Sequence, residues 1–205
     1  EPQSRFDLFD VKCSATLDGD NYIINGFKSV VFGAGMATHL IISARTEGDQ
    51  RSKSGITLFL VDIKSDGITL QNYPTIDEYR ASEVVIENLT VSKENILGEL
   101  GNSYEAIEEQ VDLSTIAICS EAVGILQVLK DSTNDYCKNR KQFGQSISAN
   151  QAIQHRLVDM MIEYEQAKSI LYMAITADLS NPDERRKAAS AAKARIGKAI
   201  KFVGE

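Results

Sequence analysis

The sequence predicts an α+β protein in which an antiparallel β-barrel or sandwich domain, residues 1–98, precedes an antiparallel bundle of long α-helices, residues 102–205. Two observations support this prediction. Before Gly98, short runs rich in β-branched and aromatic residues alternate with Gly, Asn and Asp turn signals, which is typical of strands. After Gly101, apolar residues recur every three or four positions, which is the period of an amphipathic helix.

The first part contains about seven candidate strands, and short strands at this spacing favour a sandwich or a barrel. They are residues 11–17, 22–25, 27–32, 39–46, 56–62, 68–73 and 82–91. The polar stretch EGDQRSKSG, residues 47–55, lies between two of these runs, and we expect it to be a solvated hairpin tip.

The second part contains three candidate helices, and the first, from Gly101 to about Gln142, would be about 60 Å long. It carries two apolar seams, one through Ile107, Val111, Ser114, Ile118, Ala122, Ile125, Leu129 and Tyr136 and another through Ile116, Cys119, Val123 and Leu126. Three long antiparallel helices in succession make most of a bundle.

The second and third candidate helices have equally regular faces. On the second, residues 148–179, we expect these to point inward: Ile153, Leu157, Met160, Met161, Tyr164, Leu171 and Ile175. The third begins with Asn181 as its N-cap, Pro182 at the first helical position, and an acidic first turn. Its apolar face is small: Ala188, Ala191, Ala192, Ile196, Ala199 and Val203.

Composition excludes several classes of protein. The 205 residues are 43% hydrophobic and 25% charged, which is typical of a globular protein. A net charge of −7 without a basic block argues against nucleic-acid binding. No run of eighteen apolar residues predicts a membrane span, and the acidic N-terminus does not resemble a signal peptide.

The three cysteines, Cys13, Cys119 and Cys137, are far apart in the sequence and form no C-x-x-C pair. Their number and spacing argue against a disulfide framework or a zinc site, and we expect no metal. We therefore expect a reducing, cytoplasmic compartment, with Cys119 and Cys137 packed in the core.

Three motifs occur in a distinctive order: ENILGELG at residues 94–101, RKQFG at 140–144 and NQAIQHRLVDM at 150–160. With a β-rich domain before them, this order resembles the flavin-dependent acyl-CoA dehydrogenases. The resemblance extends over residues 1–205 and implies the middle β-domain and the first three helices of the C-terminal bundle. The finer patterns EPQSRFDLFDV, NGFKSVVFGAG and SEAVG look most like the branch that includes pimeloyl-CoA dehydrogenase small subunits. Because the chain opens directly on Glu1-Pro2 and its third helix is still periodic at the end, we expect an excised segment, incomplete at both ends.

The resemblance implies FAD as the cofactor, an acyl-CoA thioester as the substrate, and α,β-dehydrogenation as in fatty acid β-oxidation. It also implies an electron-transfer flavoprotein or a similar electron acceptor. The family's corner between its first two C-terminal helices serves the FAD of a neighbouring subunit, so we expect a homo- or hetero-oligomer, dimer or tetramer.

The corner carries more chemistry than a chain reversal requires. Arg140 can offer the FAD pyrophosphate a planar cation with several donors, and Phe143 can supply an apolar face beside the cofactor. Gln142 and Gln151 can hydrogen-bond hydroxyl groups of the ribityl chain or adenosine. The alternative is an ordinary cationic helix C-terminus beside a core aromatic residue.

Two segments depart from the family pattern. Typical members have Trp-Ile-Thr against the flavin ring where this chain has Val30, Val31 and Phe32, so only backbone amides could bond the ring edge there. At the N-terminus, Arg5 and Phe6 stand where Gly and Ser are usual, although the branch named above also has an Arg-aromatic-Asp sequence. A Gly-rich strand end and a plain turn are the respective alternatives.

Dehydrogenation needs a carboxylate base, an oxyanion-stabilising pair and the flavin. In most of the family the base is a Glu on a late segment of the C-terminal domain, so we expect it beyond residue 205. Some members place it about ten residues before the glycine matching Gly124, where this chain has Ser114 and Thr115. These two can line the acyl pocket or pack, and the adjacent Asp112 is expected to be solvated or ion-paired.

Three hypotheses follow. The first is a fragment of an acyl-CoA dehydrogenase subunit, inactive alone, for which a dicarboxylyl-CoA such as pimeloyl-CoA is a candidate substrate. The second is a non-catalytic partner subunit of a hetero-oligomeric acyl-CoA dehydrogenase, which Val30 and Phe6 favour. The third is a helical interaction module without a cofactor, in which Arg140 and Phe143 would tolerate replacement.

Overall fold

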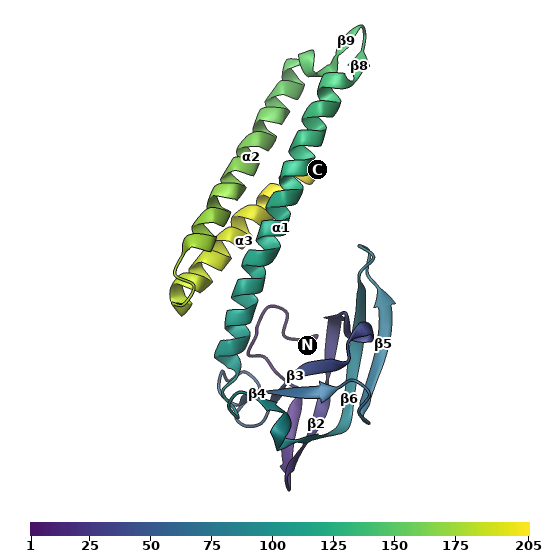
Figure 1. Ribbon diagram of the computed structural model, residues 1–205, viewed down its shortest axis with the longest axis vertical. Helices are drawn as coiled ribbons and strands as arrows, with labels where there is room; N and C mark the ends of the chain where they lie inside the picture. Colours follow the sequence, from purple (N-terminus) through teal and green to yellow (C-terminus); the bar gives the residue numbers. More distant parts are fainter. The chain divides into compact units, whose positions relative to one another are not determined.

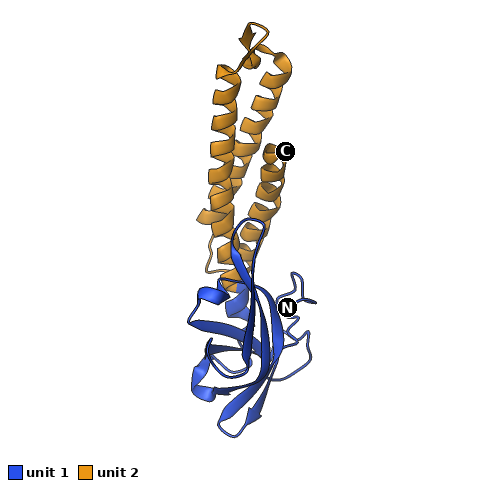
Figure 2. Cartoon of the chain, turned by 90° about the vertical axis from the view of Figure 1, so that its right-hand side faces the viewer, with its two compact units in different colours: residues 1–108 blue, residues 109–205 orange.

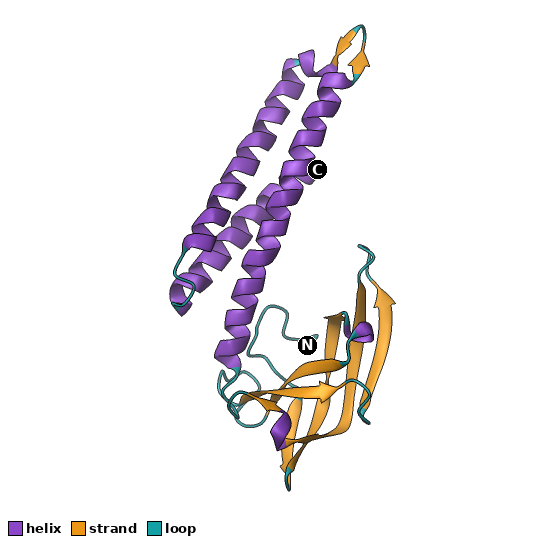
Figure 3. Cartoon of the chain, viewed as in Figure 1, coloured by secondary structure: helices purple, strands orange, loops and turns teal.

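Seven β-strands of the first half pair into one sheet (Figure 3). In the computed structural model, which describes residues 1–205, they are β1 (Ser14–Asp18), β2 (Asn21–Phe32), β3 (His39–Arg45), β4 (Ile56–Asp62), β5 (Ile68–Pro74), β6 (Arg80–Ser92) and β7 (Ile96–Leu97). Short 3-10 helices η1 (Ala34–Met36) and η2 (Lys93–Asn95) follow β2 and β6. Every run predicted as a strand contains strand residues, and 22–25 and 27–32 are halves of β2.

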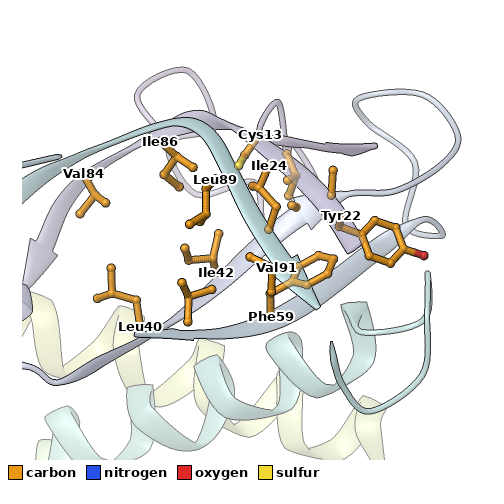
Figure 4. Close-up of a cluster of buried hydrophobic side chains, with 14 of the residues drawn as sticks. Cys13, Tyr22, Ile24, Leu40, Ile42, Phe59, Val84, Ile86, Leu89 and Val91 are labelled. Atoms are coloured by element: carbon orange, nitrogen blue, oxygen red, sulfur yellow. The ribbon is translucent and has the colours of Figure 1, made fainter. Parts of the chain in front are cut away.

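The strand order is β5-β6-β2-β1-β3-β4-β7. All neighbours are antiparallel except β1 and β3, which pair in parallel, so the predicted antiparallel arrangement is confirmed apart from this one pair. The edge strands β5 and β7 do not pair, so the sheet is not closed into a hydrogen-bonded barrel. It bends around one core, in which Val84 and Ile86 of β6 lie opposite Leu40 and Ile42 of β3 (Figure 4).

Strand β2 passes very close to the start of the sheet at Gly26. A Cβ on Gly26 would lie 2.6 Å from Sγ of Cys13, and the register of β2 against β6 slips at the same place. Only glycine fits there without displacing Cys13. This local irregularity is why the sequence pattern separates β2 into two runs.

The loop between β3 and β4, residues 47–55, is mostly exposed, as predicted, but Arg45 at the end of β3 anchors its backbone. The Arg45 side chain is buried and its guanidinium donates to four backbone carbonyls at 2.7–2.9 Å, those of Phe9, Gln50, Ser52 and Ser54. A run of polar residues predicted only a solvated tip, because the anchoring arginine belongs to a strand.

Asp10 secures the same loop and makes its stability depend on pH. The carboxylate is buried and accepts hydrogen bonds from Gln50 Nε2 and Arg51 Nε, which lower the pKa of Asp10. A depressed folded pKa adds stability above the unfolded pKa of about 3.9, and that stability is lost as the pH falls through the folded value. We expect Asp10→Asn to lose stability at pH 7 and to be less sensitive than the wild type to acidification from pH 5 to 2.

Chemical denaturation at pH 7, 5, 3 and 2 measures this difference, with Asp18→Asn, at an exposed site on β1, as the matched control. Equal pH sensitivity of wild type and Asp10→Asn would contradict the assignment.

The second half is helical: α1 (Tyr104–Asn139), α2 (Gln151–Thr176) and α3 (Pro182–Gly204) (Figure 1). The 36 residues of α1 correspond to about 54 Å. Contacts within the chain define two units, residues 1–108 and 109–205 (Figure 2). The first turn of α1 therefore belongs to the first unit, where Tyr104 and Ile107 pack on the core of the sheet.

The core of the helical unit uses the second of the two seams on α1. Its buried members are Ile116, Cys119, Val123 and Leu126, and Cys137 is also buried, which confirms the expectation for both helical cysteines. The first seam is largely exposed, at Val111, Ile118, Ile125 and Tyr136.

On α2 the residues that lie in the core are Tyr164, Ala167, Leu171 and Ala174, whereas Met161 and Ile175 are exposed and were wrongly predicted to point inward. The physical reason is the alanine-rich face of α3, against which small residues of α2 such as Ala167 and Ala174 can pack closely. Asn181 caps α3 as predicted, accepting hydrogen bonds from the amides of Asp183 and Glu184.

By length and composition alone, α1 could cross a membrane. One 18-residue window has a mean hydropathy of 1.5, and 22% of that window is buried. A single such helix is weak evidence for a membrane span, because core helices of soluble proteins pass the same test.

Candidate functional site

A tight hairpin joins α1 to α2 within the helical unit (Figure 1). It consists of β8 (Lys141–Gln142) and β9 (Gln145–Ser146), followed by η3 (Ile147–Ala149). Gln142 pairs with Gln145, so Phe143 and Gly144 are the two central residues of the turn, with φ of 52° and 83°. Positive φ at both positions is the signature of a type I′ turn, which prefers Asn-Gly, Asp-Gly or Gly-Gly.

Phe143 is therefore an unusual residue for its position. A bulky side chain at positive φ is strained, and the Phe143 ring is 101% exposed, so burial in this chain does not compensate for the strain. Backbone strain that the surrounding structure maintains is a feature of binding sites. The ring presented by this turn is thus available to a ligand or to another chain.

The polar residues predicted for the corner lie around the same turn. Arg140 is exposed, and its guanidinium has no ion-pair or hydrogen-bond partner in the chain. Its backbone is held on both sides, by the N–H donating to Tyr136 and by the carbonyl accepting from Ile147 at 2.9 Å. The Gln142 amide donates only to the carbonyl of neighbouring Lys141.

Gln151 is exposed at the first residue of α2. The structure therefore brings Arg140, Gln142, Phe143 and Gln151 into one corner. The neighbouring Gln154 has a structural contact, donating to the carbonyl of Ser148 at 2.9 Å, and His155 is exposed.

This donor set fits a dinucleotide. An unpaired guanidinium can bind a pyrophosphate through two parallel hydrogen bonds. An exposed ring can contact an apolar or aromatic group, and the exposed amides of Gln142 and Gln151 can bond hydroxyls. The alternative of a core aromatic residue is wrong for Phe143, because its ring is fully exposed.

The second predicted segment lies in the sheet unit, at the end of β2. Val30 has a φ of 53°, which is rare for a β-branched residue, and its side chain is 50% exposed. Val31 packs on the core, whereas Phe32 is 64% exposed. The structure thus presents Val30 and Phe32 outward from a distorted strand end, with no conflict with a ligand at this surface.

The N-terminal segment is tied to the sheet by Glu1. Its carboxylate accepts hydrogen bonds from the amides of Lys12 and Cys13 and from Lys28 Nζ at 2.7 Å. Burial opposes ionisation of Glu1, but Lys28 and these bonds lower its pKa. Phe6 is 98% exposed, so the bulky residue that replaces a small one does not pack in this unit.

Ser114 and Thr115 lie on α1, early in the helical unit. Ser114 is exposed and accepts a hydrogen bond from Gln110 Nε2, and Thr115 is half-buried. Neither hydroxyl is sequestered in the core, which leaves both open to a ligand.

Asp112, which was expected to be either solvated or ion-paired, is ion-paired. Its Oδ2 lies 3.4 Å from Nε of Arg185 at the start of α3, and Arg185 is only 4% exposed. The same guanidinium also donates to the carbonyl of Leu179, so Asp112 is part of a structural contact between α1 and the start of α3. The sequence reasoning missed this role, because Arg185 lies in the run DERRK, which resembles a solvated helix start.

Two protein-family models together match nearly the whole chain. The family described as acyl-CoA dehydrogenase, middle domain, matches residues 1–89, and the one described as acyl-CoA dehydrogenase, C-terminal domain, matches residues 104–205.

Individual proteins of known sequence or structure match the chain at about one third identity. The chain is 33% identical over 177 residues to the 3-(aryl)acrylate reductase of Clostridium sporogenes, covering 85% of this chain and 47% of that protein. It is 31% identical over 196 residues to the caffeyl-CoA reductase-Etf complex subunit CarC of Acetobacterium woodii, covering 94% and 51%. The crystal structure of the prolyl acyl carrier protein oxidase AnaB superposes with a TM-score of 0.89 at 30% identity, over 97% of this chain and 53% of that one. The chain spans about half the length of the relatives it matches.

Proposed function

The chain belongs to the acyl-CoA dehydrogenase family, and from this premise we propose that it forms part of the FAD site and of the acyl pocket in a flavin-dependent acyl-CoA dehydrogenase subunit. The observation that carries the proposal is the corner between α1 and α2. There an unpaired arginine stands beside a fully exposed phenylalanine held in a strained turn. Neither feature stabilises the helical unit by itself, so both are accounted for by a ligand outside it.

In this proposal each residue has one task. Arg140 neutralises the pyrophosphate of FAD, Phe143 shields an apolar part of the cofactor, and Gln142 and Gln151 bond its hydroxyls. The chemistry that FAD would supply when bound there is acceptance of the hydride from the β carbon of the acyl group. Because the corner is exposed on its own unit, we propose that it serves the FAD of a neighbouring subunit in a homo- or hetero-oligomer.

The acyl pocket receives the hydroxyls of Ser114 and Thr115, which can bind polar parts of a thioester substrate. Asp112 is committed to Arg185, so we assign the base to a carboxylate outside residues 1–205. Residues 1–205 alone are then expected to be inactive.

The substrate and partners are proposed at a finer level. A dicarboxylyl-CoA such as pimeloyl-CoA follows from the resemblance to one branch of the family, and an electron-transfer flavoprotein is the proposed acceptor in a cytoplasmic β-oxidation reaction. The relative CarC is named as a subunit of a reductase-Etf complex, which supports an acceptor of this kind.

The test is to express the full-length protein and record its visible absorption. Bound FAD is expected to give a band at about 450 nm that bleaches when an acyl-CoA substrate is added. A colourless protein that also fails to acquire FAD on reconstitution would contradict the proposal.

A second candidate function is a non-catalytic partner subunit that supports FAD held by another chain. It is favoured by Val30 and by Phe6, which stand where the family has a tryptophan and a small residue. It predicts a purified chain that is colourless alone and gains a flavin band only when the catalytic subunit is added.

Phe143→Asn separates binding from stability at the corner. Asparagine tolerates positive φ, so the free energy of unfolding of the apoprotein is expected to be unchanged or up to about 1 kcal/mol higher. The affinity for FAD is expected to fall, because the apolar face is lost. Thermal unfolding and FAD titration of the full-length protein measure the two effects, with Gln145→Asn on the same hairpin as the control; a large loss of apoprotein stability would contradict the assignment.

A further inference from the structure

We propose that Tyr73 and Glu83 are positioning residues that hold the Val30–Phe32 segment in the conformation that meets the flavin ring. The inference rests on the proposed function and extends it to two residues of β5 and β6 that the sequence did not suggest.

The segment is shaped by a β-bulge. Lys28 pairs with Val84 and Val31 pairs with Ser82, so Ser29 and Val30 together lie opposite one residue, Glu83. An extra residue in one strand reverses the side-chain alternation beyond it. The bulge is therefore the reason that Val31 faces the core while Phe32 is exposed.

The bulge is not self-sustaining. Val30 is β-branched at a φ of 53°, a strained conformation that persists only where the surrounding structure imposes it. Half of the Val30 side chain is exposed, so packing supplies little compensation. A bulge also removes a backbone N–H from the regular ladder, and that group needs another acceptor.

Tyr73 supplies the acceptor. Its hydroxyl donates to Oε1 of Glu83 at 2.8 Å, and the backbone of Val30, which acts to lower the pKa of Tyr73, faces the same hydroxyl. On the paired strands Tyr73 lies opposite Ala81 and Gln71 opposite Glu83, so the tyrosine and the glutamate are diagonal neighbours on one face. The hydrogen bond to Glu83 raises the pKa of Tyr73, so the hydroxyl keeps its proton toward Glu83 and its lone pairs toward Val30.

The carboxylate of Glu83 strengthens this relay. A charged acceptor makes the bond from Tyr73 stronger than a neutral one would, and polarised chains of hydrogen bonds reinforce one another. The other oxygen, Oε2, is buried and accepts no hydrogen bond, so the bond from Tyr73 to Oε1 is the one hydrogen bond that the carboxylate accepts. The contact that orders the bulge thus comes from two neighbouring strands.

The experiment uses the full-length protein with Tyr73→Phe, and Tyr79→Phe, an exposed tyrosine of the same hairpin, as the matched control. In the apoprotein, amide exchange of residues 28–33 is expected to be about tenfold faster in Tyr73→Phe, as for the loss of one hydrogen bond of about 1.4 kcal/mol. With FAD, Tyr73→Phe is expected to shift the flavin absorption maximum and reduction potential and to weaken FAD binding by several-fold. Tyr79→Phe is expected to match the wild type in all of these.

Two further variants keep the inference testable if Tyr73→Phe folds poorly. Glu83→Gln retains an acceptor oxygen but removes the charge, so a smaller shift of the flavin absorption and potential in the same direction is expected. The control Glu87→Gln, on the exposed part of β6, is expected to cause no shift. Glycine adopts positive φ without strain, so a protein with Val30→Gly needs less support from Tyr73. The double variant Val30→Gly with Tyr73→Phe is therefore expected to have a flavin reduction potential close to that of Val30→Gly alone.

The outcomes separate the two claims. A wild-type protein that binds no FAD overturns the proposed function and this inference with it. A wild-type protein that binds FAD, with exchange and flavin potential unaffected by Tyr73→Phe and by Glu83→Gln, overturns the inference alone.

Discussion

Replacing Arg140 by alanine is expected to weaken FAD binding by the full-length protein at least tenfold. A charged, hydrogen-bonded contact contributes about 1.5–3 kcal/mol, and each 1.4 kcal/mol is a factor of ten. Because Arg140 is exposed and unpaired in the chain, its loss is expected to leave the free energy of unfolding of the apoprotein nearly unchanged. FAD titration followed by flavin fluorescence, together with thermal unfolding, measures the two quantities.

The matched control is Lys141→Ala, which removes the same charge from the adjacent exposed residue. A similar loss of affinity in both variants would indicate general charge attraction and contradict a specific pyrophosphate contact. Arg140→Lys is expected to recover only part of the affinity, because an ammonium group lacks the planar fork. Unchanged FAD content in Arg140→Ala would exclude the assignment.

Mixing Arg140→Ala and wild-type chains tests whether the corner acts across subunits. Reassembled mixed oligomers are expected to show an FAD occupancy between those of the wild-type and the Arg140→Ala oligomers, because the arginine of one subunit would serve the FAD of its neighbour. If monomers separate and each chain keeps its own occupancy, the corner serves its own chain.

Replacing Arg185 by alanine is expected to produce the largest loss of stability in the helical unit, about 3–5 kcal/mol. The guanidinium is almost completely buried, and its removal leaves the largely buried carboxylate of Asp112 and the carbonyl of Leu179 without this donor. Chemical denaturation of the full-length protein, followed by the helical circular dichroism signal, measures the loss.

Two variants distinguish a buried ion pair from simple packing. Lys187→Ala, at an exposed position of the same helix, is expected to change stability by less than about 0.5 kcal/mol. The double variant Asp112→Leu with Arg185→Met is expected to recover most of the loss, since removing both charges leaves neither uncompensated. A loss equal to that of Lys187→Ala would show that the pair is not stabilising.

The local periodicity was sufficient to predict the elements. Alternating and β-branched runs placed six strands, and three- and four-residue repeats placed three helices with their order. The residues at the start of α3 were each predicted at the correct position, because Asn181 and Pro182 act on their immediate neighbours. In the corner, the nature of the residues predicted a binding site, and the structure placed Arg140, Gln142, Phe143 and Gln151 around one hairpin.

Other features depend on residues far apart in the sequence. The choice between two seams on α1, and the exposure of Met161 and Ile175, follow from the small alanine face of a helix that comes later in the chain. Arg45 and Arg185 resemble surface cations in the sequence, and only their partners show that they are buried anchors.

The sequence by itself therefore determined the six longer strands and the three helices, which family they resemble, and which side chains gather at the corner, because periodicity and capping are local. The short strands β7, β8 and β9 were not predicted. Only the tertiary structure decided the strand order, the bulge at Val30 with its support from Tyr73 and Glu83, and the positive φ of Phe143. The strand order and the bulge arise from pairing between strands that are distant in the sequence, and the φ of Phe143 follows from the register of the short hairpin between α1 and α2. Neither is encoded in the spacing of residues along one segment.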